Sequence, residues 1–286
     1  MAVAERLQGL GKEPAECVDI VRSVTDHEDS QQAVFALKKK LQLEDPSSGD
    51  ALERVLLTYA IREFEPKLDS LPVHPRVIPI MRKEFQAYQK APGPTPPLRA
   101  GTDPFVTACK IATGRRFTAG PMDWVISGVP RSWLKQMAWR KVPAVLRYLT
   151  VECGGLRPMF YIHLAPAPRN RSLVIPAEVH RAYYRMVRSL ERQPEIKGIA
   201  CAAWFHDPEV VRRTPHLAPL NAPYLEWGGR ILASIGEAPP DSGFLDYSPE
   251  RRKLYESGQL RPQATLAVWP RKTAIAWAEA HPELDR

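Results

Sequence analysis

The stretch Ile196-Lys-Gly-Ile-Ala-Cys-Ala-Ala-Trp-Phe205, followed directly by His206-Asp207-Pro208, decides how the middle of this chain is interpreted. A short apolar run that ends at turn-forming residues is typical of a buried strand. The Asp-Pro pair that follows favours the start of a helix, with Asp207 as its N-terminal cap. The segment therefore predicts a strand that leads straight into a helix.

Strands and helices alternate outward from this segment. The stretch before it, residues 176–193, has proline in its first turn and one apolar stripe, which predicts an amphipathic helix. Strands are expected over 117–127, 157–164, 196–205, 229–235 and 264–269, and helices over 130–149, 176–193, from 208, over 248–256 and over 272–280. This order predicts an α/β (α+β) fold in which helices flank a mixed central sheet.

The first ninety residues predict a separate helical lobe. Apolar residues recur three and four apart over 18–24, 32–43, 50–64 and 76–89. Asp50 is expected to cap the third helix, with Glu53 completing a capping box. The Pro-rich stretch 91–104 is expected to be a linker, which makes 105–286 the α/β domain.

Composition narrows the class of protein. The 286 residues carry 40 Lys and Arg against 32 Asp and Glu, a net charge of +8, which suits nucleic acid, a phosphorylated cofactor or an acidic carrier protein. No apolar run is long enough to span a bilayer, so no membrane span is expected. The four cysteines lie far apart and the first residues lack the apolar core of a signal peptide. A cytoplasmic protein with reduced thiols is expected.

Several enzyme classes lack their motifs here. No histidines have His-x-x-x-His or His-Glu-x-x-His spacing, so no metal site is predicted. The chain also has no Gly-x-Ser-x-Gly elbow of a hydrolase and no phosphate-binding loop of a nucleoside-triphosphate enzyme.

Two histidines mark the ends of expected strands. His163 lies near the end of 157–164, and His206 directly follows 196–205. Ligands bind at the carboxyl ends of strands in α/β sheets, so both imidazoles are expected in one cleft, where one can act as a general base. Asp207 can orient His206. In the alternative interpretation Asp207 only caps the next helix and His206 only covers the core.

Three arginines are candidates for holding an anion. Arg169 and Arg171 lie in the loop before the helix 176–193, and free amides at a helix start together with arginines suit a pyrophosphate. Arg131 follows Gly128 and Pro130 at another strand-to-helix connection and is available to a phosphate or carboxylate. An exposed loop and a structural turn are the alternative interpretations.

With strand, basic loop, helix, strand and helix in order from Phe160 to Trp227, the segment resembles the C-terminal half of a GNAT-type acyltransferase. The segments Tyr161-Ile-His-Leu164 and Cys201-Ala-Ala-Trp-Phe-His-Asp-Pro208 look like a GNAT-like bacterial acyltransferase group. The resemblance implies that 160–164 is the splayed strand that admits the pantetheine arm, 166–172 the phosphate loop, and 229–269 the source of the last two strands. The family's usual Arg/Gln-x-x-Gly-x-Gly/Ala loop is absent between residues 166 and 176.

The resemblance implies transfer of an acyl group from a coenzyme A or carrier thioester to an amine or hydroxyl acceptor. His206 or His163 is expected to be the base, Tyr255 to protonate the leaving thiolate, and the three arginines to hold the donor. The alternative is a non-catalytic binding or regulatory protein whose basic surface docks nucleic acid or an acidic partner. Nucleic acid has weaker support, because the tryptophans are not interleaved with clustered basic residues.

Overall fold

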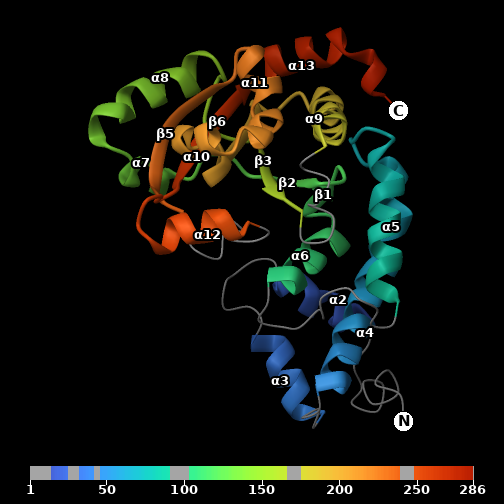
Figure 1. The fold of residues 1–286 in the computed structure, drawn as a ribbon. Helices are drawn as coiled ribbons and strands as arrows, with labels where there is room; N and C mark the ends of the chain where they lie inside the picture. Colours follow the sequence, from blue (N-terminus) through green and yellow to red (C-terminus); the bar gives the residue numbers. More distant parts are fainter. Residues whose placement is uncertain are drawn as a thin grey trace. The chain divides into compact units, whose positions relative to one another are not determined.

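A computed structural model describes residues 14–24, 32–41, 46–90, 103–165, 175–238 and 248–285 (Figure 1). The chain divides into two compact units. The first comprises Met1–Leu71 and Pro75–Thr118, and the second comprises Pro72–His74 and Ala119–Arg286. Each unit is described by itself.

The first unit is mainly helical, as predicted for the N-terminal part of the chain, but it extends beyond the predicted lobe of residues 1–90 to Thr118. Its elements are α2 (Pro14–Ser23), α3 (Gln32–Lys40), α4 (Pro46–Phe64), η1 (Glu65–Ser70), α5 (Val77–Gln89), α6 (Asp103–Ala112) and the short strand β1 (Arg116–Thr118). Leu52, Leu56, Ile61, Phe85 and Phe105 are fully buried side chains of its core. The hydrophobic effect therefore gives this unit a core of its own.

The starts of two helices bear on the predicted cap at Asp50 and on the predicted linker 91–104. Asp50 is not a cap, because α4 begins at Pro46 and Asp50 lies inside it. Proline suits a first helical turn, so the helix extends one turn further than the capping pattern indicates. Residues 91–102 of the expected linker lie outside the described residues. Helix α6, which begins at the end of that expected linker, contacts α4 within the first unit.

The second unit is built on the mixed sheet that the sequence predicts. Its strands are β2 (Met122–Ile126), β3 (Phe160–Leu164), β4 (Gly198–Ala203), β5 (Arg230–Glu237) and β6 (Gln263–Pro270). Within this unit the strand order is β2-β3-β4-β6-β5. Strands β3 and β4 are parallel, while β2 with β3, β4 with β6, and β5 with β6 are antiparallel.

Helices cover both faces of this sheet (Figure 1). The helices α7 (Arg131–Gln136), η2 (Trp139–Lys141) and α8 (Val142–Val151) lie on one face, where Val145 and Leu149 pack with Ala200 and Val268. Helices α9 (Pro176–Glu191) and α13 (Arg271–Ala280) lie on the other face. Because neighbouring residues of a strand point to opposite faces, Trp269 is directed away from Val268 and meets Tyr183 of α9 at 6.0 Å between ring centroids.

The remaining helices lie between β4 and β5, between β5 and β6, and after α13. After β4 come η4 (Trp204–His206), α10 (Pro208–Arg213), η5 (Pro215–Leu220) and α11 (Ala222–Glu226), and α12 (Pro249–Glu256) precedes β6. The short η6 (Pro282–Leu284) follows α13. In the part of the chain that the structure describes, no helix has both the length and the apolar composition needed to cross a membrane.

Two predicted elements are each divided in the structure. The strand expected over 117–127 is two strands, β1 and β2, joined by a turn in which the Ala119 amide donates to the Met122 carbonyl oxygen at 2.9 Å. The helix expected over 130–149 is broken after Gln136 into α7, η2 and α8. Helix 176–193 and the strands around 196–205 and 264–269 occur as predicted, within a few residues.

Candidate functional site

The two parallel strands β3 and β4 stay paired over a short distance. Phe160 is in register with Ile199, and Tyr161 with Ala200. Each strand continues for three residues beyond the second pair, yet the described strands show no further residue pair between them. The strands therefore separate toward their carboxyl ends.

Side chains occupy the backbone groups that this separation frees. The Tyr161 hydroxyl accepts from the Ala202 amide and donates to the Ala202 carbonyl oxygen, both at 3.3 Å. The Cys201 thiol donates to the Ile162 carbonyl oxygen at 3.7 Å. These contacts take the place of ladder hydrogen bonds, which buried backbone groups otherwise require.

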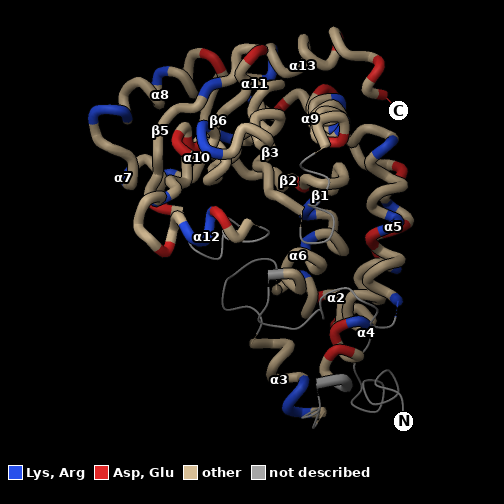
Figure 2. Tube along the Cα trace, in the orientation of Figure 1, with Lys and Arg blue, Asp and Glu red and all other residues tan. Residues whose placement is uncertain are grey.

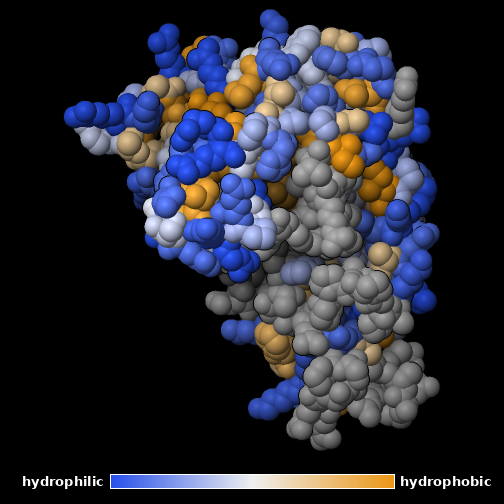
Figure 3. Space-filling model, in the orientation of Figure 1, coloured by the Kyte–Doolittle hydropathy of each residue, from blue (hydrophilic) through white to orange (hydrophobic). Residues whose placement is uncertain are grey.

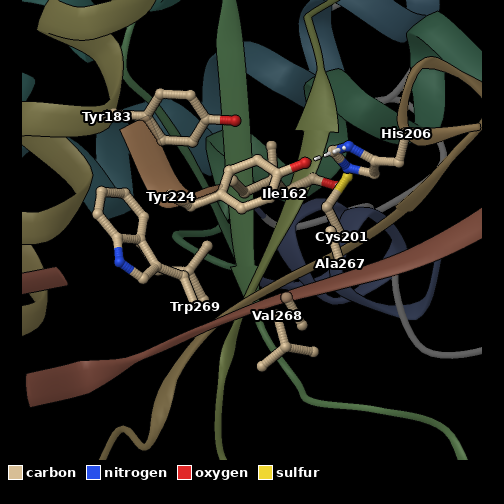
Figure 4. Close-up of a pocket in the computed structure, with 10 residues that line it drawn as sticks. Ile162, Tyr183, Cys201, His206, Tyr224, Ala267, Val268 and Trp269 are labelled. Atoms are coloured by element: carbon tan, nitrogen blue, oxygen red, sulfur yellow. Dashed lines mark hydrogen bonds between the residues drawn. The ribbon is translucent and has the colours of Figure 1, made fainter. Parts of the chain in front are cut away.

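A small pocket lies beside the separation (Figure 4). Its volume of about 10 Å³ is room for about one water molecule. The sheet and the helices around it supply the lining residues Ile162, Tyr183, Ile199, Ala200, Cys201, His206, Tyr224, Ala267, Val268 and Trp269. Its walls are therefore largely apolar, with polar atoms from a thiol, two phenols and an imidazole.

His206 is the ionisable group at the centre of a buried network. Its Nδ1 lies 2.7 Å from Asn221 Oδ1 and 2.7 Å from the Tyr224 hydroxyl oxygen. The Tyr224 hydroxyl also donates to Asn221 Oδ1 at 2.7 Å. All three side chains are buried, and Figure 4 shows Tyr224 and His206 joined at the edge of the pocket.

Asn221 determines which nitrogen of His206 carries the proton. The Asn221 side-chain amide donates to the Phe205 carbonyl oxygen at 2.9 Å, which turns Oδ1 toward the imidazole. Because Oδ1 only accepts hydrogen bonds, Nδ1 must be the protonated nitrogen. The lone pair then lies on Nε2, which is buried and has no hydrogen-bond partner among the described residues.

Burial also sets the charge of the imidazole and the thiol. Desolvation lowers the pKa of His206 to about 4, and the hydrogen bond with Asn221 opposes this in part. Burial raises the pKa of the Cys201 thiol to about 12. His206 is therefore a neutral base near neutral pH, while Cys201 is a protonated thiol and a weak nucleophile.

Asp207 is occupied by backbone contacts. Its Oδ1 accepts from the Glu209 amide at 2.9 Å and thereby caps α10, as one of the two interpretations predicts. Its Oδ2 accepts from the Gln263 amide at the start of β6 at 2.7 Å. The carboxylate thus connects a helix start with a strand, and Asn221 instead orients His206.

His163 and His206 lie on opposite faces of the sheet. The ring of His163 meets that of Tyr161, two residues earlier on β3, at 4.9 Å between centroids. Residues two apart share a face, and Tyr161 packs against the core cluster on the α8 side, whereas Tyr224, the partner of His206, meets Trp269 on the α9 side at 6.4 Å between ring centroids. The expectation that both imidazoles share one cleft is therefore wrong.

The other expected residues lie outside this pocket. Tyr255 is on α12, where the Arg261 guanidinium lies 4.7 Å from its ring centroid. Arg131 is the exposed first residue of α7. Arg169 and Arg171 lie outside the described residues, and the described ones include no group of three side chains suited to a metal ion.

Asn221, Tyr224 and Tyr161 are the site residues that sequence patterns did not identify. Asn221 and Tyr224 are three residues apart around the start of α11, with Pro223 in the first turn. That spacing and the proline predict a helix start, but they do not predict that it packs against His206.

No protein-family model, curated protein or solved structure matches the chain.

Proposed function

We propose that this protein transfers an acyl group from a coenzyme A or carrier thioester to an amine or hydroxyl acceptor. The observation that carries the proposal is the separation of β3 and β4 after two residue pairs. A pantetheine arm in this separation displaces the Tyr161 and Cys201 side-chain contacts and pairs its two amide groups with the backbone groups that those side chains now occupy.

The order of elements also supports the resemblance to GNAT-type acyltransferases. Helix α9 connects the two separating strands, and β5 and β6 follow as the last two strands. Helix α9 begins at Pro176, soon after the end of β3 along the chain. The free amides of a helix start suit a pyrophosphate.

His206 supplies the acid–base chemistry in this proposal. Its Nε2 takes a proton from the acceptor as the acceptor nitrogen or oxygen attacks the thioester carbonyl carbon. The bond from carbon to the new nitrogen or oxygen forms, the carbon–sulfur bond breaks, and the imidazolium returns the proton to the leaving thiolate. Direct attack agrees with the protonated state of Cys201, because no covalent enzyme intermediate is needed.

The test measures release of free thiol when the full-length protein is mixed with acyl-coenzyme A species of increasing chain length and a set of amines and alcohols. Wild-type protein should turn over at least one pair. His206→Ala should lower the rate roughly 10²-fold or more, as expected for loss of a general base.

His216→Ala is the matched control, because His216 is exposed on η5 and should leave the rate unchanged. Binding of coenzyme A to each variant, measured by calorimetry, separates loss of the base from loss of the fold. Equal turnover by His206→Ala and wild type removes His206 from the reaction. If no acyl-coenzyme A or acyl carrier is bound or consumed, the protein is not an acyltransferase.

A further inference from the structure

The helices α7, η2 and α8 form a strongly basic surface, which we call the α7–α8 surface (residues 131–151). It carries five exposed cations and no Asp or Glu: Arg131, Lys135, Arg140, Lys141 and Arg147. The whole chain has a net charge of +8, and these 21 residues alone have a net charge of +5. Figure 2 shows Lys and Arg along α8, with an acidic residue, the C-cap Glu152, only where the helix ends.

These cations differ from those on neighbouring helices. Arg212 and Arg213 both pair with Glu209 on α10, and similar pairs within a turn occur on α9. Among the described residues, the five cations of the α7–α8 surface have no ion pair with a carboxylate. Like charges close together destabilise a helix slightly, so an unneutralised cluster is favoured where it meets an anionic partner.

An exposed tryptophan lies within this cluster. The Trp139 side chain is 76% exposed, and the Arg140 guanidinium lies 5.4 Å from its ring centroid. Met137 and Val145 of the same segment are buried in the core against the sheet. The tryptophan is therefore presented on an anchored surface, and Figure 3 shows hydrophilic side chains projecting beside apolar ones at this end of the view.

The α7–α8 surface is connected to the separated strands. Trp133 of α7 contacts Tyr161 with 5.5 Å between ring centroids, and the Tyr161 hydroxyl is the group that bridges to β4 at Ala202. A partner bound on α7 is therefore adjacent to the residue that fills the separation.

We propose that the α7–α8 surface docks an acidic acyl carrier protein, which delivers its thioester to the separation of β3 and β4. This rests on the proposed acyltransferase function and specifies its donor. Exposed cations meet the carrier's carboxylates, and Trp139 inserts between them. Trp and Arg are the residues that most often dominate the binding energy of protein interfaces, and complementary charge guides the encounter.

A protein partner fits this surface better than a membrane or a nucleic acid. A helix that lies in a membrane interface needs a broad apolar face, whereas the α7–α8 surface has two large exposed apolar residues, Trp139 and Val151, among its five cations. Single-stranded nucleic acid needs several aromatic side chains on which bases stack.

The experiment measures binding of the full-length protein to a fluorescently labelled, purified acyl carrier protein at low salt. Lys135→Glu combined with Lys141→Glu should weaken binding at least tenfold, and so should Trp139→Ala. The matched control, Lys253→Glu combined with Lys272→Glu, reverses two exposed lysines on α12 and α13 and should stay within twofold of wild type. Raising the salt concentration should weaken wild-type binding.

Turnover of free acyl-coenzyme A separates this inference from the proposed function. All these variants should consume acyl-coenzyme A at the wild-type rate, because none of the changed residues lines the pocket. If acyl-coenzyme A is consumed but the carrier protein does not bind, or binds both double variants equally, the docking surface is wrong while the function stands. If the protein binds anionic vesicles or single-stranded DNA and does not bind the carrier protein, the proposal of a carrier-docking surface is also wrong.

Discussion

At the scale of single residues, His206 combines a buried base with a fixed orientation. Asn221 and Tyr224 hold the Nδ1 side, and the hydrogen bond from Asn221 to the Phe205 carbonyl oxygen holds Asn221. No carboxylate takes part in these contacts, so the imidazole stays neutral in the folded state. A neutral buried histidine makes stability depend on pH in a defined direction.

Stability should fall as pH falls from about 6.5 toward 4. In the unfolded chain the His206 imidazole is exposed to water and binds a proton with the ordinary histidine pKa of 6.5, whereas in the folded chain burial lowers that pKa to about 4. Unfolding therefore takes up a proton in this window, and acid favours the unfolded state, by about 3 kcal/mol in the limit. Urea unfolding at a series of pH values measures this slope.

A variant comparison isolates the contribution of His206. His206→Gln should flatten the pH dependence between 6.5 and 4, while His216→Gln, changed at an exposed histidine, should leave it as in wild type. His74 and His180 also have lowered pKa values, mainly through burial, and both variants retain them. An unchanged slope in His206→Gln would show that the buried imidazole is protonated in the folded state.

At the scale of elements, Asp207 joins α10 to β6 through its two carboxylate oxygens. Asp207→Ala should destabilise the second unit by about 2 kcal/mol, because it removes a cap and leaves the partly buried Gln263 amide unpaired. Ser248→Ala removes only the cap of α12, a 3.2 Å contact to the Arg251 amide, and should cost about 1 kcal/mol.

Urea unfolding of both variants gives the two losses, and thiol release gives the activity of the folded fraction. Asp207→Ala should keep its activity per folded molecule if Asp207 acts only as a cap and strand anchor. A large loss of activity without loss of stability would assign Asp207 to the reaction.

The elements that the sequence predicts well are those with strong local signals. Helix α9 has an apolar stripe and Pro176 at its first turn, and Asp207 and Ser248 cap helices because capping involves residues two or three apart. The elements predicted over 117–127 and 130–149 are each divided in the structure. Both contain a residue that favours the break, but their apolar pattern alone predicts one continuous element. Gly120, with φ of +113°, allows the turn between β1 and β2, and Pro143 in the first turn of α8 favours a new helix start there.

The site itself depends on contacts that local patterns do not encode. His206 follows a buried strand, which made it a candidate, but the Asn221 side chain that orients it lies 15 residues later. His163 has the same local signal and lies on the other face of the sheet, because alternation along β3 places it with Tyr161. Strand ends predict where histidines occur, and register determines which face they reach.

At the scale of the whole molecule, the chain divides into two compact units, each with fully buried apolar side chains. Leu56 on α4 is fully buried in the first unit, and Leu266 on β6 is fully buried in the second. A core that belongs to one unit is lost when that unit unfolds, whatever the state of the other. Units whose cores are separate are expected to unfold in separate transitions.

Calorimetry should therefore show two transitions, each sensitive to one core. Leu56→Ala and Leu266→Ala each remove the same buried side chain and should each cost about 3 kcal/mol, which lowers the midpoint of one transition by several degrees. Leu225→Ala, at a side chain that is 45% exposed, should shift neither. If both buried substitutions lower one shared transition, the two units unfold together, and the separate cores do not define separate folding units.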